Sequence, residues 1–268
     1  MNHSIPKPDN PNNPLDQMAA YIEIVRILRK ECPWDKEQTH KSISHLLIEE
    51  AYEVYDAISK DDWDDLSKEL GDVLLHIVMH SVMAEEEGKF NLAQVIASNA
   101  NKMVKRHPHI FGDVEVSGTS DVLQNWETIK MTEGRKSVFD GVPTNLPSLI
   151  KAERIQEKAA KVGFDWSDKR DVWDKVEEEI TELKVEIDAG NKAKIEDELG
   201  DVIFAIVNAA RFENITPENA LQSTNNKFIR RFQYIEQVAK ERGLELKKMT
   251  LEQMDEIWNE AKANERKQ

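Results

Sequence analysis

The stretch IEEAYE at residues 48–53 is repeated as EEEITE at residues 177–182 in this chain of 268 residues. A second motif, KELGDVL at residues 68–74, returns as DELGDVI at residues 197–203. In both pairs the second copy lies 129 positions after the first. One shared offset indicates that a unit was duplicated together with the connection between its two acidic segments.

Composition and periodicity favour helices throughout. Ten Gly and nine Pro are few for this length, which fits long helices joined by short connections. Apolar residues recur at helical spacing in both copies. We therefore predict an all-α fold of duplicated helical-bundle domains. The predicted helices cover residues 16–31, 42–59, 63–87, 91–106 and 120–133 in the first copy, and 148–161, 168–188, 191–212, 217–241 and 250–264 in the second.

Two polar, Pro-containing stretches suggest the domain limits. The opening sequence MNHSIPKPDNPNNP lacks the apolar core of a signal peptide and predicts a disordered leader at residues 1–14. The stretch GRKSVFDGVPTNLPS contains two Gly and two Pro, which predicts a linker at residues 136–146. The first domain is then expected at residues 15–135 and the second at residues 147–268.

Charge and cysteine content limit the partners. The chain has 36 Lys and Arg against 51 Asp and Glu, a formal net charge of −15, which argues against nucleic acid as a partner. A single cysteine, Cys32, excludes an intrachain disulfide and suits a reducing compartment. No apolar run is long enough to cross a bilayer. We expect a cytoplasmic protein without a membrane partner.

Each copy carries pairs of carboxylates spaced three residues apart on two successive helices. Residues at this spacing share a helix face, and here that face continues an apolar stripe. Facing carboxylates are costly unless a cation neutralises them, and ligands that are all oxygen favour Mg²⁺, with Mn²⁺ as the alternative. A solvated acidic face is the competing interpretation, but repetition favours the metal site. The predicted ligands are Glu179, Glu182, Glu198 and Asp201; the first copy offers Glu50, Glu53, Glu69 and Asp72.

Basic residues distinguish the copies. A polyphosphate needs bases beside its metal ions, and Lys175 and Lys194 each lie one turn before a predicted ligand. The first copy has Leu46 and Asp65 at the equivalent positions. We therefore predict that the second copy holds the competent site, and that the first acts on another substrate or serves structure or regulation. The predicted substrate-binding residues are Lys175, Glu179, Lys194, Asp201, Lys227, Arg230, Arg231 and Trp258.

The paired motifs EEAYE…ELGD and EEEITE…ELGD, with CPWD at residues 32–35 and the late Trp motifs NWETIK and IWNEAK, resemble the two-domain form of the MazG family of nucleoside triphosphate pyrophosphohydrolases. This resemblance implies an all-α fold, a homodimer, dependence on Mg²⁺, and hydrolysis of NTPs or dNTPs, ATP included, to the monophosphate and pyrophosphate. It also favours stacking of Trp258 on the nucleotide, although a core or interface position for this residue is open.

In the expected mechanism a water molecule attacks, and Glu178 or one of the metal-ligating carboxylates accepts its proton. Attack at the α or the β phosphorus gives the same products, so both are open. Three alternatives compete with this function. They are a related all-α pyrophosphatase with a narrow substrate such as dUTP or a phosphoribosyl nucleotide, a di-iron bundle whose usual Glu-x-x-His pairs are absent here, and a non-catalytic regulatory protein. A regulatory protein partner also remains open.

Overall fold

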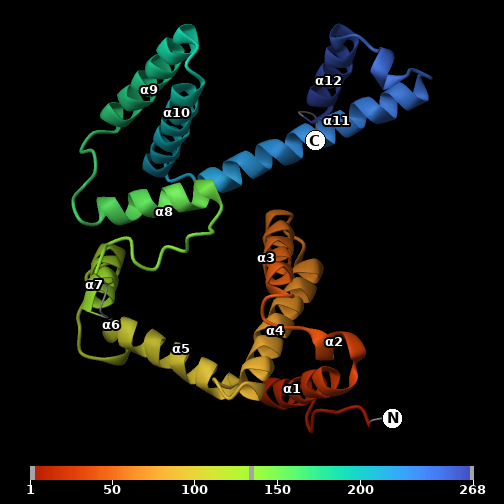
Figure 1. The fold of residues 1–268 in the computed structure, drawn as a ribbon, viewed down its shortest axis with the longest axis vertical. Coiled ribbons are helices and arrows are strands. Elements are labelled where there is room, and N and C mark those ends of the chain that lie inside the picture. The colour runs from red at the N-terminus through yellow and green to blue at the C-terminus, as the bar shows by residue number, and fades with distance from the viewer. Residues whose placement is uncertain (1–3, 133–135, 266–268) are drawn as a thin grey trace. The chain divides into compact units, whose positions relative to one another are not determined.

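The computed structural model describes residues 4–132 and 136–265, and within these ranges it contains helices and no strands. This confirms the predicted all-α fold. The chain divides into two compact units, unit 1 at Met1–Trp126 and unit 2 at Glu127–Gln268 (Figure 1). Residues 1–3 of the predicted leader, residues 133–135 of the predicted first domain and residues 266–268 lie outside the described residues.

Unit 1 is built around a helical hairpin, α3 (Ser44–Ser59) packed on α4 (Trp63–Glu86), with α1 lying against α4 (Figure 1). Its buried core joins Val25 of α1, Ile43 just before α3, and four side chains of α4. The remaining helices of this part of the chain are α1 (Pro14–Glu31), α2 (Pro33–Glu37), α5 (Leu92–Arg106), α6 (Pro108–Phe111) and α7 (Thr119–Thr132), the last of which extends beyond Trp126.

Unit 2 repeats the hairpin as α9 (Lys169–Ala189) packed on α10 (Lys192–Phe212), with α8 (Ser148–Ala160) against α10. Val172 and Val176 of α9 pack on Ala205 and Ala209 of α10. A second cluster joins the long α11 to α12. The remaining elements are α11 (Pro217–Glu241), the 3-10 helix η1 (Leu246–Lys248) and α12 (Leu251–Glu265). The predicted long helices are confirmed to within a few residues at each end, whereas α2, α6 and η1 were not predicted.

The turn of each hairpin shows the duplication at the level of backbone geometry. Asp61 (φ 54°) and Gly190 (φ 68°), 129 positions apart, both take the left-handed conformation that reverses the chain. The next residue then caps the following helix in both cases. Asp62 accepts a hydrogen bond from the Asp65 amide, and Asn191 accepts one from the Lys194 amide. The same short turn therefore makes both pairs of acidic helices antiparallel neighbours.

The stretch predicted as a linker, residues 136–146, makes specific contacts within unit 2. The buried Lys158 of α8 donates a hydrogen bond from Nζ to the Val138 carbonyl oxygen at 2.9 Å. Phe139 lies against the α8–α10 region. The separation of the two units falls between Trp126 and Glu127, within α7. Among the described helices, none combines the length and the apolar character that a membrane span requires.

Substitution of Gly190 by Ala is expected to lower the free energy of unfolding by about 1 kcal/mol, because a side chain at a left-handed position is strained. The decrease would be measured as a lower thermal midpoint by circular dichroism. The control is Asp61→Gly at the equivalent turn, which removes a side chain from a left-handed position and should not destabilise. Equal losses from both variants would contradict this account of the turns.

Candidate active site

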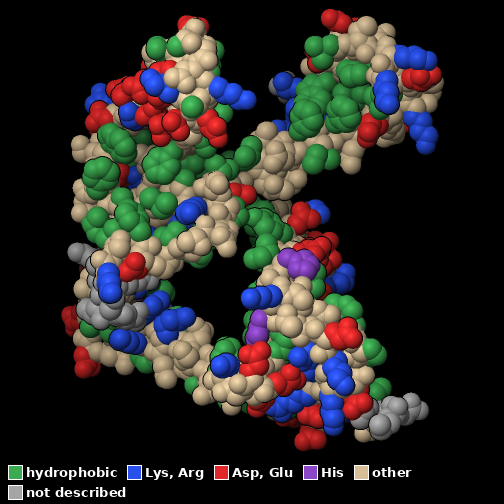
Figure 2. All heavy atoms as spheres, in the orientation of Figure 1, with side chains coloured by type: hydrophobic (Ala, Val, Ile, Leu, Met, Phe, Trp, Pro, Cys, Tyr) green, Lys and Arg blue, Asp and Glu red, His purple; other side chains and the backbone are tan. Residues whose placement is uncertain are grey.

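Three carboxylates of unit 2 converge between α9 and α10. Glu179 comes from α9, and Glu198 and Asp201 come from α10; each offers an oxygen atom, and these oxygens all lie within 4.8 Å of one another. Glu179 is buried, with 7 % of its surface exposed. Acidic side chains gather over this hairpin in the space-filling view (Figure 2). Three of the four predicted metal ligands are therefore brought together.

Helical spacing explains why these acids meet. Val172 and Val176 anchor one face of α9 against α10, and Glu179 lies on that same face one turn further along. On α10, Asp201 lies one turn before Ala205, which packs against the valines. The fourth predicted ligand, Glu182, is exposed and is not part of the group of three. It is nevertheless close enough for its charge to act on Glu198.

Lys175 is the basic partner of this cluster. Its Nζ atom lies 2.7 Å from Glu178 Oε1 and 2.7 Å from Glu179 Oε1. The hydrogen bonds to Glu178 and then to Glu179 raise the pKa of Lys175, so its ammonium group stays charged at neutral pH. Lys175 therefore compensates one buried carboxylate and fixes the position of Glu178, which is itself more than half exposed.

The other two carboxylates, Glu198 and Asp201, form no ion pair with a described lysine or arginine of unit 2, although the charge of Lys194 acts on Glu198. Burial first, and then the charges of its acidic neighbours, raise the pKa of Glu198 above its usual value. The neighbours are Glu182, Asp201, Glu179 and Glu186. A compact set of oxygen donors that repel one another is the arrangement that a hard divalent cation stabilises, so the residues present fit a Mg²⁺ or Mn²⁺ ion.

A cavity of about 330 Å³ opens beside the acidic cluster. This volume lies within the range of about 300–1,000 Å³ that is usual for small-molecule sites. Lys175, Glu179 and Asp201 line it on one side, so the cluster and the cavity form a single site. Much of the remaining wall is apolar and aromatic. Phe139 comes from the segment before α8, Phe164 and Trp166 from the segment after it, and Phe204 from α10.

Several polar wall residues were missed by the sequence analysis. The Arg211 guanidinium donates to Asp165 Oδ2 at 3.0 Å and to Asn208 Oδ1 at 3.0 Å. The buried Gln156 donates from Nε2 to the Phe204 carbonyl oxygen at 2.8 Å, which leaves its Oε1 atom without a hydrogen-bond partner. Helical periodicity could have predicted two of these residues, because Asn208 and Arg211 lie on the same face of α10 as Asp201. The segment containing Asp165 has no such periodicity.

Comparison with known proteins assigns the chain to a family. The family model of the MazG nucleotide pyrophosphohydrolase domain matches twice, at residues 38–111 and 170–235. This chain belongs to the MazG family. The matches contain the two acidic hairpins, and they confirm the predictions of a duplicated MazG unit and of a hydrolase that acts on acid anhydrides.

Relatives that match more than nine tenths of this chain support the same assignment. The nucleoside triphosphate pyrophosphohydrolase of Escherichia coli (strain K12) is 42 % identical over 259 residues, which cover 94 % of this chain and 98 % of that protein. The nucleoside triphosphate pyrophosphohydrolase/pyrophosphatase MazG of Thermotoga maritima is 42 % identical over 253 residues, covering 91 % of this chain and 96 % of that one. The uncharacterized protein YabN of Bacillus subtilis (strain 168) is 50 % identical over 257 residues, or 94 % of this chain and 53 % of YabN.

The remaining predicted substrate-binding residues do not line the cavity of this MazG unit. Lys194 pairs with Glu186 at 3.0 Å. Arg230 and Arg231 on α11 both bind Glu265 on α12, each at 2.7 Å. Trp258 is half-buried in the cluster between α11 and α12, where its ring lies 5.2 Å from that of Phe228 and the Arg231 guanidinium lies 5.4 Å from its centre. Lys227 lies on α11 near this cluster in the sequence.

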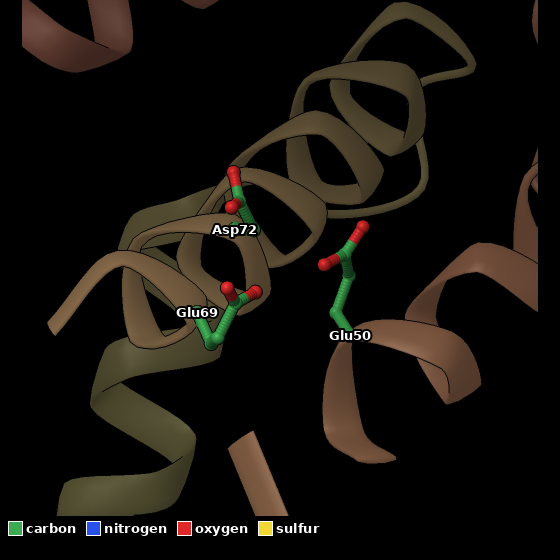
Figure 3. A group of neighbouring side chains, drawn as sticks. All are labelled: Glu50, Glu69 and Asp72. Atoms are coloured by element: carbon green, nitrogen blue, oxygen red, sulfur yellow. The ribbon is translucent and has the colours of Figure 1, made fainter. Parts of the chain in front are cut away.

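The first MazG unit has an equivalent acidic cluster. Glu50 of α3 and Glu69 and Asp72 of α4 turn their carboxylates toward one another, with oxygens within 4.8 Å (Figure 3). Glu53, like its equivalent Glu182, is exposed and outside the group of three. Burial and neighbouring acidic charges raise the pKa values of Glu50 and Glu69.

What surrounds the cluster differs between the units. A shift of 129 positions relates the cavity residues Lys175, Asn208 and Arg211 to Leu46, Met79 and Val82. These three side chains belong to the apolar core that α1 and α4 share in unit 1. Unit 2 thus combines its acids with a cavity that has polar groups, whereas the same positions of unit 1 are filled by packed apolar side chains.

The raised pKa of Glu198 predicts a pH dependence for the metal-free protein. The folded chain holds the Glu198 proton more tightly than the unfolded chain, so this residue's contribution to stability falls as the pH rises from its usual pKa of 4.5 up through the raised value. Magnesium competes with that proton, so its affinity should rise over the same interval. In Glu198→Gln the stability should vary less with pH, as measured by thermal denaturation. The magnesium affinity should also vary less with pH, as measured by titration calorimetry.

The control for that experiment is Asp197→Asn, which changes an exposed neighbour outside the group of three. It should keep the pH dependence of the parent protein. A magnesium affinity that is flat with pH in the parent would count against a metal site at Glu198.

Proposed function

We propose that unit 2 catalyses the Mg²⁺-dependent hydrolysis of nucleoside triphosphates and deoxynucleoside triphosphates, ATP included, to the nucleoside monophosphate and pyrophosphate. One observation carries this proposal: Lys175, Glu179 and Asp201 line the same cavity as the aromatic side chains. A ligand in this cavity would meet both charged groups and apolar surface, as a nucleotide requires. The proposal also agrees with the names of the relatives from E. coli and T. maritima.

Glu179, Glu198 and Asp201 would hold the metal, and Glu182, whose charge acts on Glu198, is a fourth candidate ligand. When bound, Mg²⁺ supplies positive charge that neutralises phosphate oxygens and makes water more acidic. Lys175 is charged and lines the cavity, so it would bind a phosphate oxygen directly. Lys194, one turn before Glu198, is a second candidate for phosphate binding.

Glu178 is the proposed general base. Lys175 fixes its carboxylate at 2.7 Å, and the side chain is exposed enough to take a proton from an attacking water molecule. The positive charge of Lys175 would also stabilise the negative charge that develops on the leaving group, which is pyrophosphate for attack at the α phosphorus and the nucleoside monophosphate for attack at the β phosphorus. Attack at the α or the β phosphorus is consistent with this arrangement, and both give the same products.

The nucleoside would occupy the aromatic part of the cavity. Phe139, Phe164, Trp166 and Phe204 offer surfaces that tolerate different bases. Gln156 offers an unpaired acceptor, because its amide nitrogen is already held by the Phe204 carbonyl oxygen. An N–H group of a base is the complement of this acceptor, and burying both groups together would remove the cost of leaving Oε1 unpaired.

We further propose that the enzyme is a cytoplasmic homodimer. Lys227, Arg230, Arg231 and Trp258 lie outside the cavity of their own chain, and a second copy could supply them to a bound nucleotide. Large apolar side chains on α10 and α11 support such an interface, since Ile206 and Phe228 are about half exposed. Trp258 would then serve either as a stacking residue or as an interface anchor.

The two acidic clusters make a matched experiment. With ATP and Mg²⁺, the parent protein should release AMP and pyrophosphate, identified by phosphorus NMR. Glu179→Gln should lower kcat at least about 100-fold, since losing a metal ligand removes several kcal/mol of transition-state stabilisation. Glu50→Gln, at the equivalent position of unit 1, should leave turnover within about twofold of the parent.

Release of ADP and orthophosphate would overturn the proposed reaction. Equal losses from Glu179→Gln and Glu50→Gln, in variants that keep the parent's helical content, would overturn the assignment of catalysis to unit 2 alone.

A further inference from the structure

A buried histidine of unit 1 is directed at the acidic cluster of that unit. His76 lies one turn after Asp72 on α4, and only 7 % of its surface is exposed. Its Nε2 atom is 4.0 Å from Glu50 Oε1 on α3, beyond hydrogen-bond distance. Its Nδ1 atom is buried without a hydrogen-bond partner. A buried imidazole with an unpartnered ring nitrogen is unusual, and here the other nitrogen faces the Glu50 carboxylate.

The neighbouring histidines do not share this position. His40 and His80 bind each other, with their Nδ1 atoms 2.8 Å apart and their rings stacked. One of these nitrogens must donate and the other must accept, so the pair occupies both atoms. His76 is therefore available to the cluster, whereas His80, one turn further along α4, provides a matched control.

The acids of unit 1 also lack the compensation that exists in unit 2. Lys175 pairs with Glu179 in unit 2, but Leu46 takes its place in unit 1. Among residues 4–132, no lysine or arginine is found in an ion pair with Glu50, Glu69 or Asp72. The position of His76, in turn, is taken by Ala205 in unit 2. Unit 1 has exchanged a compensating ammonium group for an imidazole, which is a ligand for metal ions.

We propose that Glu50, Asp72 and His76, with Glu69 beside them, form a mixed carboxylate–imidazole site in unit 1 for a first-row transition-metal ion such as Mn²⁺ or Co²⁺. Such ions accept imidazole nitrogen together with carboxylate oxygen, whereas Mg²⁺ prefers oxygen alone. Asp72 and His76 lie four residues apart on α4, a spacing that places both on one face. Glu50 of α3 lies within 4.8 Å of Asp72 and 4.0 Å from His76, measured between their ligand atoms. The bound ion would connect α3 to α4 and complete the charge balance of the hairpin.

Pulsed EPR on the full-length protein loaded with Mn²⁺ tests this site without relying on hydrolysis. A directly coordinated imidazole gives a nitrogen-14 modulation of the Mn²⁺ echo. The proposed unit 2 ligands contain oxygen donors only, so a nitrogen signal reports on unit 1. We expect the signal in the parent protein, its loss in His76→Ala, and its retention in His80→Gln.

The His76→Ala variant has the residue that unit 2 carries at the equivalent position, Ala205. The hairpin of unit 2 packs with this alanine in its core, so the variant hairpin is expected to fold. Calorimetric titration with Mn²⁺ should show at least about a tenfold weaker affinity at one site in this variant, with the affinity for Mg²⁺ changed less. The parent protein alone can overturn the proposal: Mn²⁺ bound without any nitrogen modulation excludes the imidazole. A modulation that persists in His76→Ala would exclude it equally.

Discussion

Mutual repulsion among Glu179, Glu198 and Asp201, held within 4.8 Å of one another across the α9–α10 hairpin, is the constraint on which the rest of unit 2 depends. The apolar contacts of Val172 and Val176 with Ala205 and Ala209 force these side chains together. Lys175 offsets the charge of Glu179. Burial and the negative charges of the neighbouring acids still raise the pKa of Glu198. Apolar packing of the hairpin thus holds together carboxylates that repel one another, and a divalent cation would neutralise them.

The two units share the acidic hairpin and differ in the residues that surround it. Both units retain the left-handed turn, the helix cap and three converging carboxylates, at a constant separation of 129 positions. In unit 2 the adjoining positions carry Lys175, Asn208 and Arg211 around a cavity. In unit 1 they carry Leu46, Met79 and Val82 inside a core. The chemistry assigned to each unit follows from these neighbours, since the acids themselves are nearly the same.

The sequence allowed the helices and the acidic clusters to be predicted, because both follow from local periodicity. Spacings of three residues place Glu179 beside Glu182, but they do not determine which carboxylate reaches the neighbouring helix, and Glu182 is exposed. The cavity could not be predicted from the sequence. It forms only when α8 and the aperiodic segment after α8 fold against the hairpin. Arg231 was grouped with the acids as part of a basic patch and Trp258 by resemblance, whereas both lie between α11 and α12 in the structure.

The central claim is that the acids and the cavity of unit 2 form one nucleotide site. The most direct measurement is a crystal structure with Mn²⁺ and an ATP analogue whose α–β bridging oxygen is replaced by nitrogen, using anomalous scattering to locate the metal. The account predicts an anomalous peak among Glu179, Glu198 and Asp201, with phosphates on that ion and the base inside the aromatic cavity. An analogue bound away from this cavity, with no metal at the three carboxylates, would contradict it.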